Sequence, residues 1–519
     1  MPRMSYRVVW FKRDLRVQDH APLAEAARQG PVLCLYILEP ALWQQPDAAR
    51  QHLGFLQESL KDLVTDLRAH GGRLQWAVGD AVEVLDRLHH HAPFAELLSH
   101  QETGNAASYE RDRRVLRWCR EHAVPWREFR GFGVVRGLRQ RRHWASQWEA
   151  LMAEPQAVLP RITPASPPAE AWDPRPWPSA DGLGLPAHEP PQRQRGGRRQ
   201  GEAVLTDFLQ QRSARYRGGI SSPLTAPDAC SRLSAHLAFG TLGLREVVQA
   251  TRTRMHDTEL AGTRQHAGLA AFLSRLHWHC HFIQKLETEP AIEHHNMHRG
   301  YNGLREAEHN PAHLQALMEG RTGWPMVDAC VAMLRETGWL NFRMRSMLVS
   351  VAAYPLWLHW RPVGEWLARE FLDYEPGIHW SQMQMQSGTT GINTTRVYNP
   401  VKQAQDHDPQ GRFVRHWLPA LQQVPDTWLF QPWLMPSDLQ QRMGLRPGLD
   451  LVEPRVDLET ATRRAKERVH ALRARREVQA DQADIVRRHG SKQRRAEQLA
   501  GPRQRRAAEA ASQQLGFDF

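Results

Sequence analysis

The chain has 519 residues, with 68 Lys plus Arg against 56 Asp plus Glu and a formal net charge of +12. This length is too great for one ordinary core, so we expect two domains with extensions, and the positive charge favours a polyanionic partner. The five cysteines show no C-x-x-C spacing, which argues against a zinc site, an iron–sulfur cluster and a disulfide framework. Because neither a long apolar run nor a cleavable leader pattern occurs, the sequence predicts a cytoplasmic protein without membrane spans.

The first part of the chain alternates short β-rich runs with helical patterns. Helical periodicity is clearest at residues 52–70 and 108–122. Strands separated by helices predict a parallel, doubly wound sheet with helices on both faces, so we expect an α/β domain over residues 5–135. The expected strands are residues 8–11, 32–38, 74–78, 94–99 and 126–129.

Proline marks the next segment, with 11 prolines between residues 154 and 191. This composition predicts an inter-domain linker, placed at residues 136–200. From residue 201 to 453 the pattern becomes helical, most clearly at 272–287 and 328–360, which predicts an all-α domain.

A basic extension is expected over residues 454–519, because residues 459–519 hold 15 basic and 8 acidic residues. The run TRRAKERVHALRARRE predicts a basic helix, followed by a frayed end. A solvated charged helix without a partner remains the alternative for this segment taken alone.

Two further signals lie in the helical region. Ten of the 19 Trp fall between Trp278 and Trp433, many beside His or Arg, which suits a large planar ligand or nucleobases, although each indole alone could be core. In CSRLSAHLAFGTLGLRE, Ser231 and Ser234 open a helical run whose free N–H groups could bind phosphate oxygens, with Arg245 as an added cation. Simple N-capping is the alternative.

Four blocks carry a resemblance to a known family: VVWFKRDLRVQDHAPL, SRLSAHLAFGTLGLRE, TGWPMVDACVAMLRETGWLNFRMR and RVYNPVKQAQDHDPQGRFVRHWLPAL. Their order, over roughly residues 7–421, resembles the photolyase/cryptochrome family. The resemblance implies an α/β antenna-type domain at 5–135, a wrapping linker, and a helical domain at 201–453 that binds a U-shaped FAD beneath a basic groove for UV-damaged DNA.

The activity implied by the resemblance is light-dependent DNA repair, in which FADH⁻ drives electron transfer that splits pyrimidine dimers. A cryptochrome-like blue-light photoreceptor is the alternative, and a DNA- or RNA-binding architectural protein with a structural flavin is a third possibility. The sequence leaves open whether the lesion is a cyclobutane dimer or a (6–4) photoproduct.

The resemblance also implies the residues of the FAD site. Asp373 matches the Asp that pairs with an Arg, here Arg345, and Glu375 stands where a second Asp usually holds the N3 edge of the ring. His379 occupies the position facing flavin N5, where Asn is usual, and Cys230 replaces a usual Thr. The full expected set is Tyr216, Ser231, Arg232, Leu233, Ser234, Phe272, His279, Asn341, Arg345, Asp373, Tyr374, Glu375 and His379.

Six positions match residues that face DNA in the family, and three of them depart from the repair enzymes. Arg275 stands in place of a Glu, Phe342 in place of an Asn, and Met385 in place of a stacking Trp. These substitutions concentrate around one cavity, which is expected to read the base edges with other groups. The expected DNA-facing set is Arg275, Trp278, Phe342, Arg343, Met385 and Gln403.

The resemblance further implies a chain of three Trp that refills the flavin with electrons, of which only the middle position, Trp360, matches. Met383 and Ala307 stand at the two ends. We expect a rerouted path in which Trp380 or Trp339 is the first donor. The alternative is that these indoles only pack and that the flavin is reduced chemically.

Three expectations concern other partners. A second antenna chromophore, a pterin or a deazaflavin, is possible at SHQETGNAASYERDRR, residues 99–114, but that segment is too generic to assign either. The terminal QQLGFDF is a possible docking peptide for a repair or replication partner, unless it packs back on the body. We expect a monomer without a metal ion.

Overall fold

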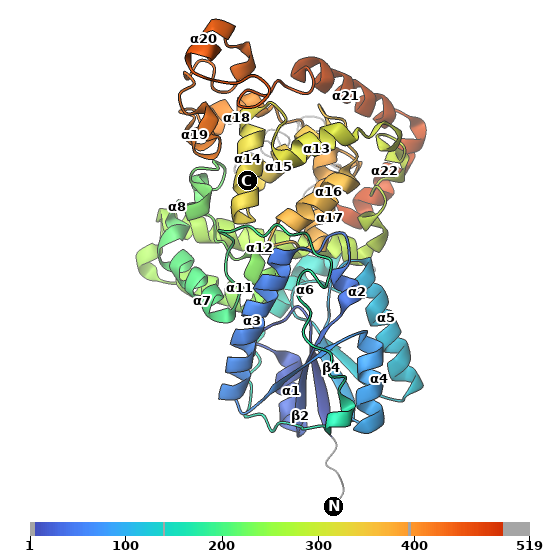
Figure 1. Cartoon of the computed structure of the whole chain (residues 1–519). Helices are drawn as coiled ribbons and strands as arrows, with labels where there is room; N and C mark the ends of the chain where they lie inside the picture. Colours follow the sequence, from blue (N-terminus) through green and yellow to red (C-terminus); the bar gives the residue numbers. More distant parts are fainter. Residues whose placement is uncertain (1–5, 139–140, 393–395, 491–519) are drawn as a thin grey trace, which may run out of the picture.

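The computed structural model describes residues 6–138, 141–392 and 396–490. The described chain forms two parts stacked end to end, a sheet flanked by helices and a larger helical part above it (Figure 1). Among the described residues, no helix is both long and apolar enough to cross a membrane.

The sheet has five parallel strands in the order β3-β2-β1-β4-β5. Its strands are β1 (Arg7–Phe11), β2 (Val32–Leu38), β3 (Leu74–Val78), β4 (Glu96–His100) and β5 (Trp126–Phe129). In the register of the central pair, Arg7 lies opposite Val32 and Phe11 opposite Tyr36. The predicted parallel sheet is therefore confirmed, with the fourth strand beginning two residues later than expected.

Helices cover both faces of the sheet, because β1 is apolar on both sides. Val9 and Phe11 pack in one buried cluster with residues of α1 and α3, whereas Val8 and Trp10 pack in another with residues of α4 and α5. The helices of this part are α1 (Ala21–Gln29), α2 (Pro40–Trp43), α3 (Arg50–Ala69), α4 (Ala81–His91) and α5 (Ala106–Glu121).

The segment between the two parts contacts both of them. It begins with a helix that composition did not predict, α6 (Trp144–Ala153), whose Trp144 and Trp148 are buried with residues of the helical part. Farther on, the chain is extended and pairs with β2, where Val32 N donates to Thr163 O at 2.8 Å. A proline-rich segment therefore supplies packing to both cores instead of only joining them.

The helical part is built around α14 to α17, whose apolar side chains form the largest buried cluster. Helix α17 packs against α12, α15 and α16, and so lies at the centre of this part. The helices are α7 (Arg198–Asp207), α8 (Ser213–Gly219), α9 (Ala226–Ala229), α10 (Ser234–Ala238), α11 (Leu244–Met255), α12 (Arg264–Thr288), α13 (Pro311–Glu319), α14 (Pro325–Thr337), α15 (Phe342–Ala353), α16 (Trp360–Glu370), α17 (Pro376–Ser387), α18 (Pro400–His407), α19 (Arg412–Trp417) and α20 (Ser437–Arg442).

The extension forms two helices, α21 (Leu458–Arg473) and α22 (Arg476–His489), so the prediction of one basic helix through TRRAKERVHALRARRE was wrong. The break at residues 474–475 lets both helices bury apolar residues in one cluster, with Val469 and Val478 beside Tyr301 and Tyr354. The expected frayed end and the terminal QQLGFDF lie outside the described residues.

The two helices of the extension lie along the helical part (Figure 1), and polar contacts also hold them there. The Arg468 guanidinium lies 4.2 Å from the ring centre of Trp357 and pairs with Glu308. On α22, Gln482 Nε2 donates to Gly391 O at 3.0 Å, and the carbonyl oxygen of Val478 accepts from His298 Nε2 at 2.8 Å.

Candidate functional site

The centre of the candidate site is an ion pair between α15 and the segment before α17. Arg345 Nη1 lies 2.9 Å from Asp373 Oδ1, and Nη2 lies 3.0 Å from Oδ2, so the pair is bidentate. Burial alone would raise the pKa of Asp373, but the Arg345 charge and hydrogen bonds from Arg345 and Ser234 hold it below its ordinary value. The carboxylate is therefore ionised at neutral pH, and it joins two segments that the resemblance assigns to FAD.

The segment around Ser234 forms the second wall. Arg232 has a left-handed backbone with φ of 60°, and its guanidinium lies 3.9 Å from the ring centre of Trp339. Burial lowers the pKa of Arg232 to about 10, so it is a cation at neutral pH in a partly desolvated place. The helical run expected from Ser231 is short, because α10 begins only at Ser234.

Arg245, which the sequence offered as an added phosphate ligand, is engaged elsewhere. Its Nε donates to Asp19 Oδ2 at 2.9 Å, and Nη1 donates to Glu154 Oε2 at 3.2 Å. The guanidinium therefore links α11 to the sheet domain, and the expectation that it adds a cation to the phosphate site was wrong.

Two buried oxygen atoms at this site have no hydrogen-bond partner among the described residues, Glu375 Oε1 and Asn341 Oδ1. Asn341 uses its other amide atom, because Nδ2 donates to Ile220 O at 3.0 Å and to Ser221 O at 2.9 Å. Buried acceptors left unpaired are costly, and most native ones find a donor. Unpaired acceptors, together with the cations Arg345 and Arg232 of the same expected site, fit a large ligand that brings both N–H groups and phosphates, as FAD does.

His379 and Tyr374 lie next to each other at the start of α17, with ring centres 5.1 Å apart. His379 Nε2 lies 2.8 Å from Gly364 O, and because a carbonyl only accepts, this nitrogen carries the proton. Burial lowers the pKa of His379 to about 4, so the ring is neutral at physiological pH. The Tyr374 hydroxyl points to the sheet domain, where it donates to Asp47 Oδ2 at 2.7 Å.

The remaining residues expected at the cofactor are placed on α8, α10 and α12. The rings of Tyr216 and Phe272 are 5.8 Å apart and buried, and Leu233 is buried directly before α10. His279 lies on α12, and burial lowers its pKa to about 4. His279 and Glu375 both line a cavity of about 50 Å³ between the two parts of the molecule.

The positions expected to face DNA come from four helices. Arg275 and Trp278 lie on α12, with the Trp278 ring edge-on to His281 at 4.8 Å. Phe342 begins α15 and is 42% exposed, whereas Arg343 beside it is buried. Met385 lies on α17, and Gln403 on α18 is buried with its Oε1 unpaired among the described residues.

Two of the three expected electron-transfer indoles are neighbours. The rings of Trp360 and Trp380 are 5.9 Å apart at 67°, and both are buried. Trp360 Nε1 donates to Asn296 Oδ1 at 2.7 Å. The Arg361 guanidinium lies 4.4 Å from the ring centre of Trp380, while Trp339 lies beneath Arg232.

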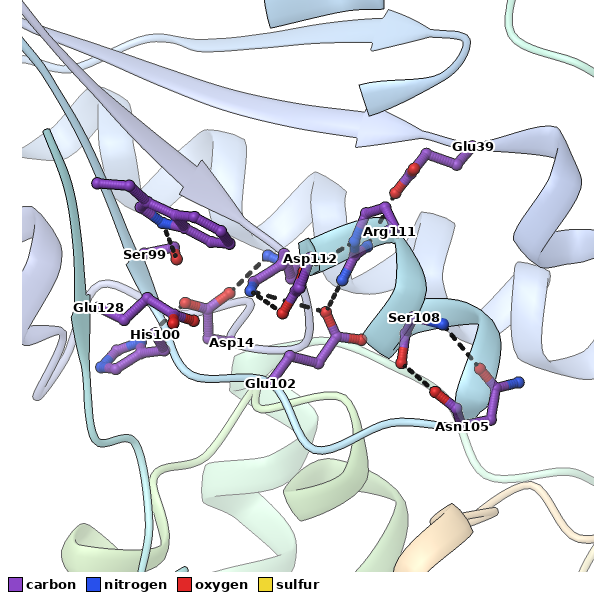
Figure 2. A network of polar contacts seen from close by, with 12 residues as sticks. Asp14, Glu39, Ser99, His100, Glu102, Asn105, Ser108, Arg111, Asp112 and Glu128 are labelled. Atoms are coloured by element: carbon purple, nitrogen blue, oxygen red, sulfur yellow. Dashed lines mark hydrogen bonds and ion pairs between the residues drawn. The ribbon is translucent and has the colours of Figure 1, made fainter. Parts of the chain in front are cut away.

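The segment suggested for a second pigment forms a buried ionic network at the carboxyl end of the sheet (Figure 2). Arg111 Nε donates to Asp112 at 2.9 Å, Nη1 donates to Glu39 at 2.8 Å, and Nη2 pairs with Glu102. The Lys12 ammonium lies 3.5 Å from Asp112 and 5.0 Å from the ring centre of Trp10. The Arg111 guanidinium and its three carboxylates are thus paired with one another, and Glu102 and Lys12 also line the cavity between the two parts.

A second buried group next to that network consists of Asp14, His20 and His100, whose ligand atoms are close enough to hold a metal ion. His20 Nε2 and His100 Nδ1 both bond Asp14 Oδ2, at 2.9 and 2.8 Å. His20 Nδ1 accepts from Leu23 N at 3.1 Å, so its Nε2 carries the proton and donates to Asp14. The group is explained by hydrogen bonding without an ion.

Sequence reasoning missed the residues that the sheet domain contributes to this site. Arg13 Nη2 lies 3.2 Å from Glu375 Oε2, and His52 Nε2 lies 3.0 Å from Phe371 O. Arg13 stands in the first block that carries the resemblance, but nothing in that block shows which distant segment it meets.

Comparisons with known proteins agree with this geometry. Residues 7–136 match the family model described as DNA photolyase, and residues 272–471 match the model described as the FAD binding domain of DNA photolyase. A deoxyribodipyrimidine photo-lyase from Streptomyces griseus is 31% identical over 485 residues, which cover 89% of this chain and 98% of the relative. A cryptochrome DASH from Gloeobacter violaceus is 29% identical over 477 residues, which cover 87% of this chain and 93% of the relative.

Solved structures share the fold. A class III photolyase from Agrobacterium tumefaciens aligns with a TM-score of 0.76 at 23% identity, covering 92% of this chain and 99% of that chain. A cryptochrome from Synechocystis aligns with a TM-score of 0.77 at 21% identity, covering 89% of this chain and 99% of that chain. An archaeal photolyase from Sulfolobus tokodaii, solved with two FAD molecules, aligns with a TM-score of 0.72 at 23% identity. The alignment covers 90% of this chain and 99% of that chain. Given the Streptomyces relative and the two family models, this chain belongs to the photolyase/cryptochrome family.

Proposed function

We propose that the chain is a light-dependent DNA photolyase that splits pyrimidine dimers in UV-damaged DNA. The observation that carries the proposal is the partly buried, bidentate Arg345–Asp373 pair, together with Glu375 two residues later, whose Oε1 has no hydrogen-bond partner among the described residues. A pair of this kind supplies a fixed cation, and the unpaired carboxylate oxygen supplies an acceptor for a ligand N–H group. Bound and reduced, FAD supplies the photoexcited electron for this chemistry.

Each protein group then has a binding or orienting role. Arg345 would place a positive charge near the flavin ring, which gains electron density on reduction. This charge would favour the reduced flavin electrostatically. Glu375 and Asn341 would accept hydrogen bonds from the cofactor through oxygens that are unpaired among the described residues. The neutral His379 donates to Gly364 O through Nε2, which leaves Nδ1 as an acceptor.

The lesion would be bound by the positions on α12, α15, α17 and α18. A dimer must leave the duplex to reach a buried cofactor, and Trp278 offers an aromatic face on which a flipped base can stack. Arg275 offers a cation that would stabilise negative charge on the dimer. Gln403 Oε1, buried and unpaired among the described residues, offers an acceptor for a base N–H group.

A repair assay tests the proposal. The FAD-loaded, reduced protein is given one oligonucleotide with a cyclobutane dimer and another with a (6–4) photoproduct, under blue light and in the dark. We expect light-dependent restoration of one lesion. Repair of neither lesion by a protein with full FAD occupancy would contradict the proposal.

A cryptochrome-like photoreceptor is the second candidate. It is favoured by Arg275, Phe342 and Met385, which replace the residues that repair enzymes carry at those positions. It predicts a light-induced change of the bound flavin together with no repair of either lesion. The same assay therefore decides between the two candidates.

A further inference from the structure

Arg13 joins the sheet domain to both segments expected to hold the cofactor. It follows β1, at the carboxyl end of the sheet. Its Nε donates to Ala238 O at 2.9 Å, and its Nη2 donates to Tyr374 O at 3.1 Å and lies 3.2 Å from Glu375 Oε2. One side chain from the first domain therefore contacts the end of α10 and the segment before α17 at once.

Close packing fixes the loop that carries Arg13. Gly240 has φ of 65°, and a Cβ there would lie 2.2 Å from Arg13 O and 2.6 Å from Asp14 Cα. Leu15 N donates to Phe239 O at 3.3 Å, and Arg16 Nη1 donates to Gly240 O at 3.1 Å. Because backbone meets backbone here, the guanidinium has little freedom to move away from Glu375.

The two oxygens of Glu375 have different environments. Oε2 faces Arg13, whereas Oε1 is buried with no hydrogen-bond partner among the described residues. Burial raises the pKa of Glu375, and the rise is opposed first by the Arg13 charge and then by the backbone N–H of Gly377. Without Arg13, desolvation would act on the carboxyl unopposed by this cation.

The other groups around Glu375 do not replace Arg13. Of the other cations that line the cavity, Lys12 lies 3.5 Å from Asp112, and Arg16 donates to Gly240 O at 3.1 Å. His279 and His100 have pKa values lowered to about 4 and about 3 by burial, so both are neutral at physiological pH. Asp14 and Glu102 carry the same sign as Glu375, and Asp14 is already bound by two histidines. The charged and titratable side chains that line the cavity with Glu375 are Lys12, Arg13, Asp14, Arg16, His100, Glu102 and His279.

We propose that Arg13 is a positioning residue of the cofactor site, which keeps Glu375 ionised and directs its free oxygen toward an N–H group of the flavin. The inference rests on the proposed function, because it takes the flavin as the ligand of Glu375. It makes the sheet domain part of the cofactor site, since the cation that controls the acceptor comes from the loop after β1.

The test measures FAD affinity of the apoprotein as a function of pH, for the parent and for Arg13→Met, Arg13→Lys and Glu375→Gln. The ionised Glu375 accepts a hydrogen bond from the flavin more strongly than the protonated carboxyl does. The affinity for FAD should therefore rise as the pH increases through the pKa of this carboxyl. Loss of a neighbouring opposite charge shifts a pKa by about one to three units. We therefore expect the midpoint of Arg13→Met to lie at least about one pH unit above that of the parent, with binding that becomes about tenfold weaker than the parent's below the parent midpoint.

The other variants separate charge from geometry. Arg13→Lys keeps the charge and should keep the parent midpoint, with weaker binding because one ammonium cannot make all the contacts of the guanidinium. Glu375→Gln should remove the pH dependence, and the double variant should match it. Arg7→Met, which removes an ion pair to Glu96 on the neighbouring strand, should match the parent.

The outcomes distinguish the two proposals. If Arg13→Met shows the parent midpoint while Glu375→Gln has lost the pH dependence, the role of Arg13 is overturned and the flavin site stands. If the parent binds no FAD, or if Glu375→Gln binds it with the parent's pH profile, the placement of the flavin fails. Circular dichroism of each variant at both pH extremes separates misfolding from weakened affinity, and the double variant measures the coupling even if Arg13→Met is less stable.

Discussion

Two arginines in this molecule bind carboxylates, one in the sheet domain and one in the helical part, and they differ in burial and in the acceptors around them. At the carboxyl end of the sheet, Arg111 binds Glu39, Glu102 and Asp112 through its three nitrogens (Figure 2). In the helical part, Arg345 binds Asp373, but two acceptors of the same expected site, Glu375 Oε1 and Asn341 Oδ1, have no partner among the described residues. An arginine–carboxylate pair alone therefore says little about ligands. Unpaired buried acceptors occur elsewhere among the described residues too, as at Glu128 Oε1 and Glu287 Oε2, so they support a ligand only together with the cations of the expected cofactor site.

The largest expected effect is on stability, from Arg111→Met. Removing this guanidinium leaves three buried carboxylates without their shared partner, and breaking a buried pair costs on the order of 3 to 5 kcal/mol. FAD affinity, measured without urea where the variant is fully folded, should not change, because Arg111 lies outside the candidate flavin site. Urea unfolding and flavin titration of the same sample measure the two quantities.

Its control is Arg446→Met, which breaks an exposed bidentate pair with Asp450. Exposed pairs contribute little because water and salt screen them, so this variant should unfold like the parent. Loss of FAD from a folded Arg111→Met protein would show that the Arg111 network belongs to the flavin site. The proposed difference between the Arg111 and Arg345 clusters would then be wrong.

The next effect is on the cofactor, from Asp373→Ala. The change leaves Arg345 unpaired, and with the Arg345 side chain 23% exposed the low end of the range for a buried pair applies, about 3 kcal/mol. FAD should bind about a hundredfold more weakly, with a smaller loss of stability than in Arg111→Met. Flavin absorbance after gel filtration measures the loss.

The same pair predicts a pH dependence. Because the pKa of Asp373 is lowered in the folded protein, the pair contributes fully above the ordinary pKa of about 3.9 and loses its contribution as pH falls through the lowered value. Asp450→Ala is the matched control for the substitution. Full FAD occupancy in a folded Asp373→Ala protein would place the cofactor elsewhere.

A moderate effect is expected on photoreduction. Trp380→Phe and Trp360→Phe keep most of the side-chain volume and remove an easily oxidised ring, so each should slow flavin photoreduction in the presence of a thiol reductant. Trp339→Phe should slow it less, because Trp339 lies beneath Arg232 while Trp360 and Trp380 contact each other. Flavin absorbance followed under constant blue light, at constant reductant, measures the rates.

Arg361→Gln gives a test in the opposite direction. Its guanidinium lies 4.4 Å from Trp380 and opposes a positive charge on that indole, so its removal should make photoreduction faster. If all three Phe variants are reduced as fast as the parent, the rerouted path is wrong and the indoles serve only in packing.

The smallest effect concerns DNA affinity and the end of the chain. A chain ending at Gly490 lacks Lys492, Arg494, Arg495, Arg503, Arg505 and Arg506. The slope of log affinity against log salt should flatten by about 0.9 for each phosphate of duplex DNA that these side chains neutralise. Removal of residues 513–519 alone takes away no basic residue and should leave the slope unchanged. An equal slope for the chain ending at Gly490 would exclude a role of this segment in binding.

The sheet could be predicted from the sequence because the hydrophobic periods of strands and helices differ, and because short apolar runs such as VLCLYIL are typical of buried strands. The Arg345–Asp373 pair followed from the family resemblance, and the geometry agrees with it. Contacts such as Arg13 with Glu375 could not be predicted, because a single charged residue carries no signal of its distant partner. The break between α21 and α22 was missed for a similar reason, since only the apolar surface around Tyr301 and Tyr354 requires it.

The docked C-terminal helices have a consequence for how the protein is made. The surface they cover, including Tyr301, Tyr354 and Trp357, belongs to segments translated long before α22. Chains fold during synthesis from the amino end, so this apolar patch remains open on the nascent protein until α22 has left the ribosome. Chains that terminate early should therefore depend on chaperones and aggregate readily, although both family domains have been translated.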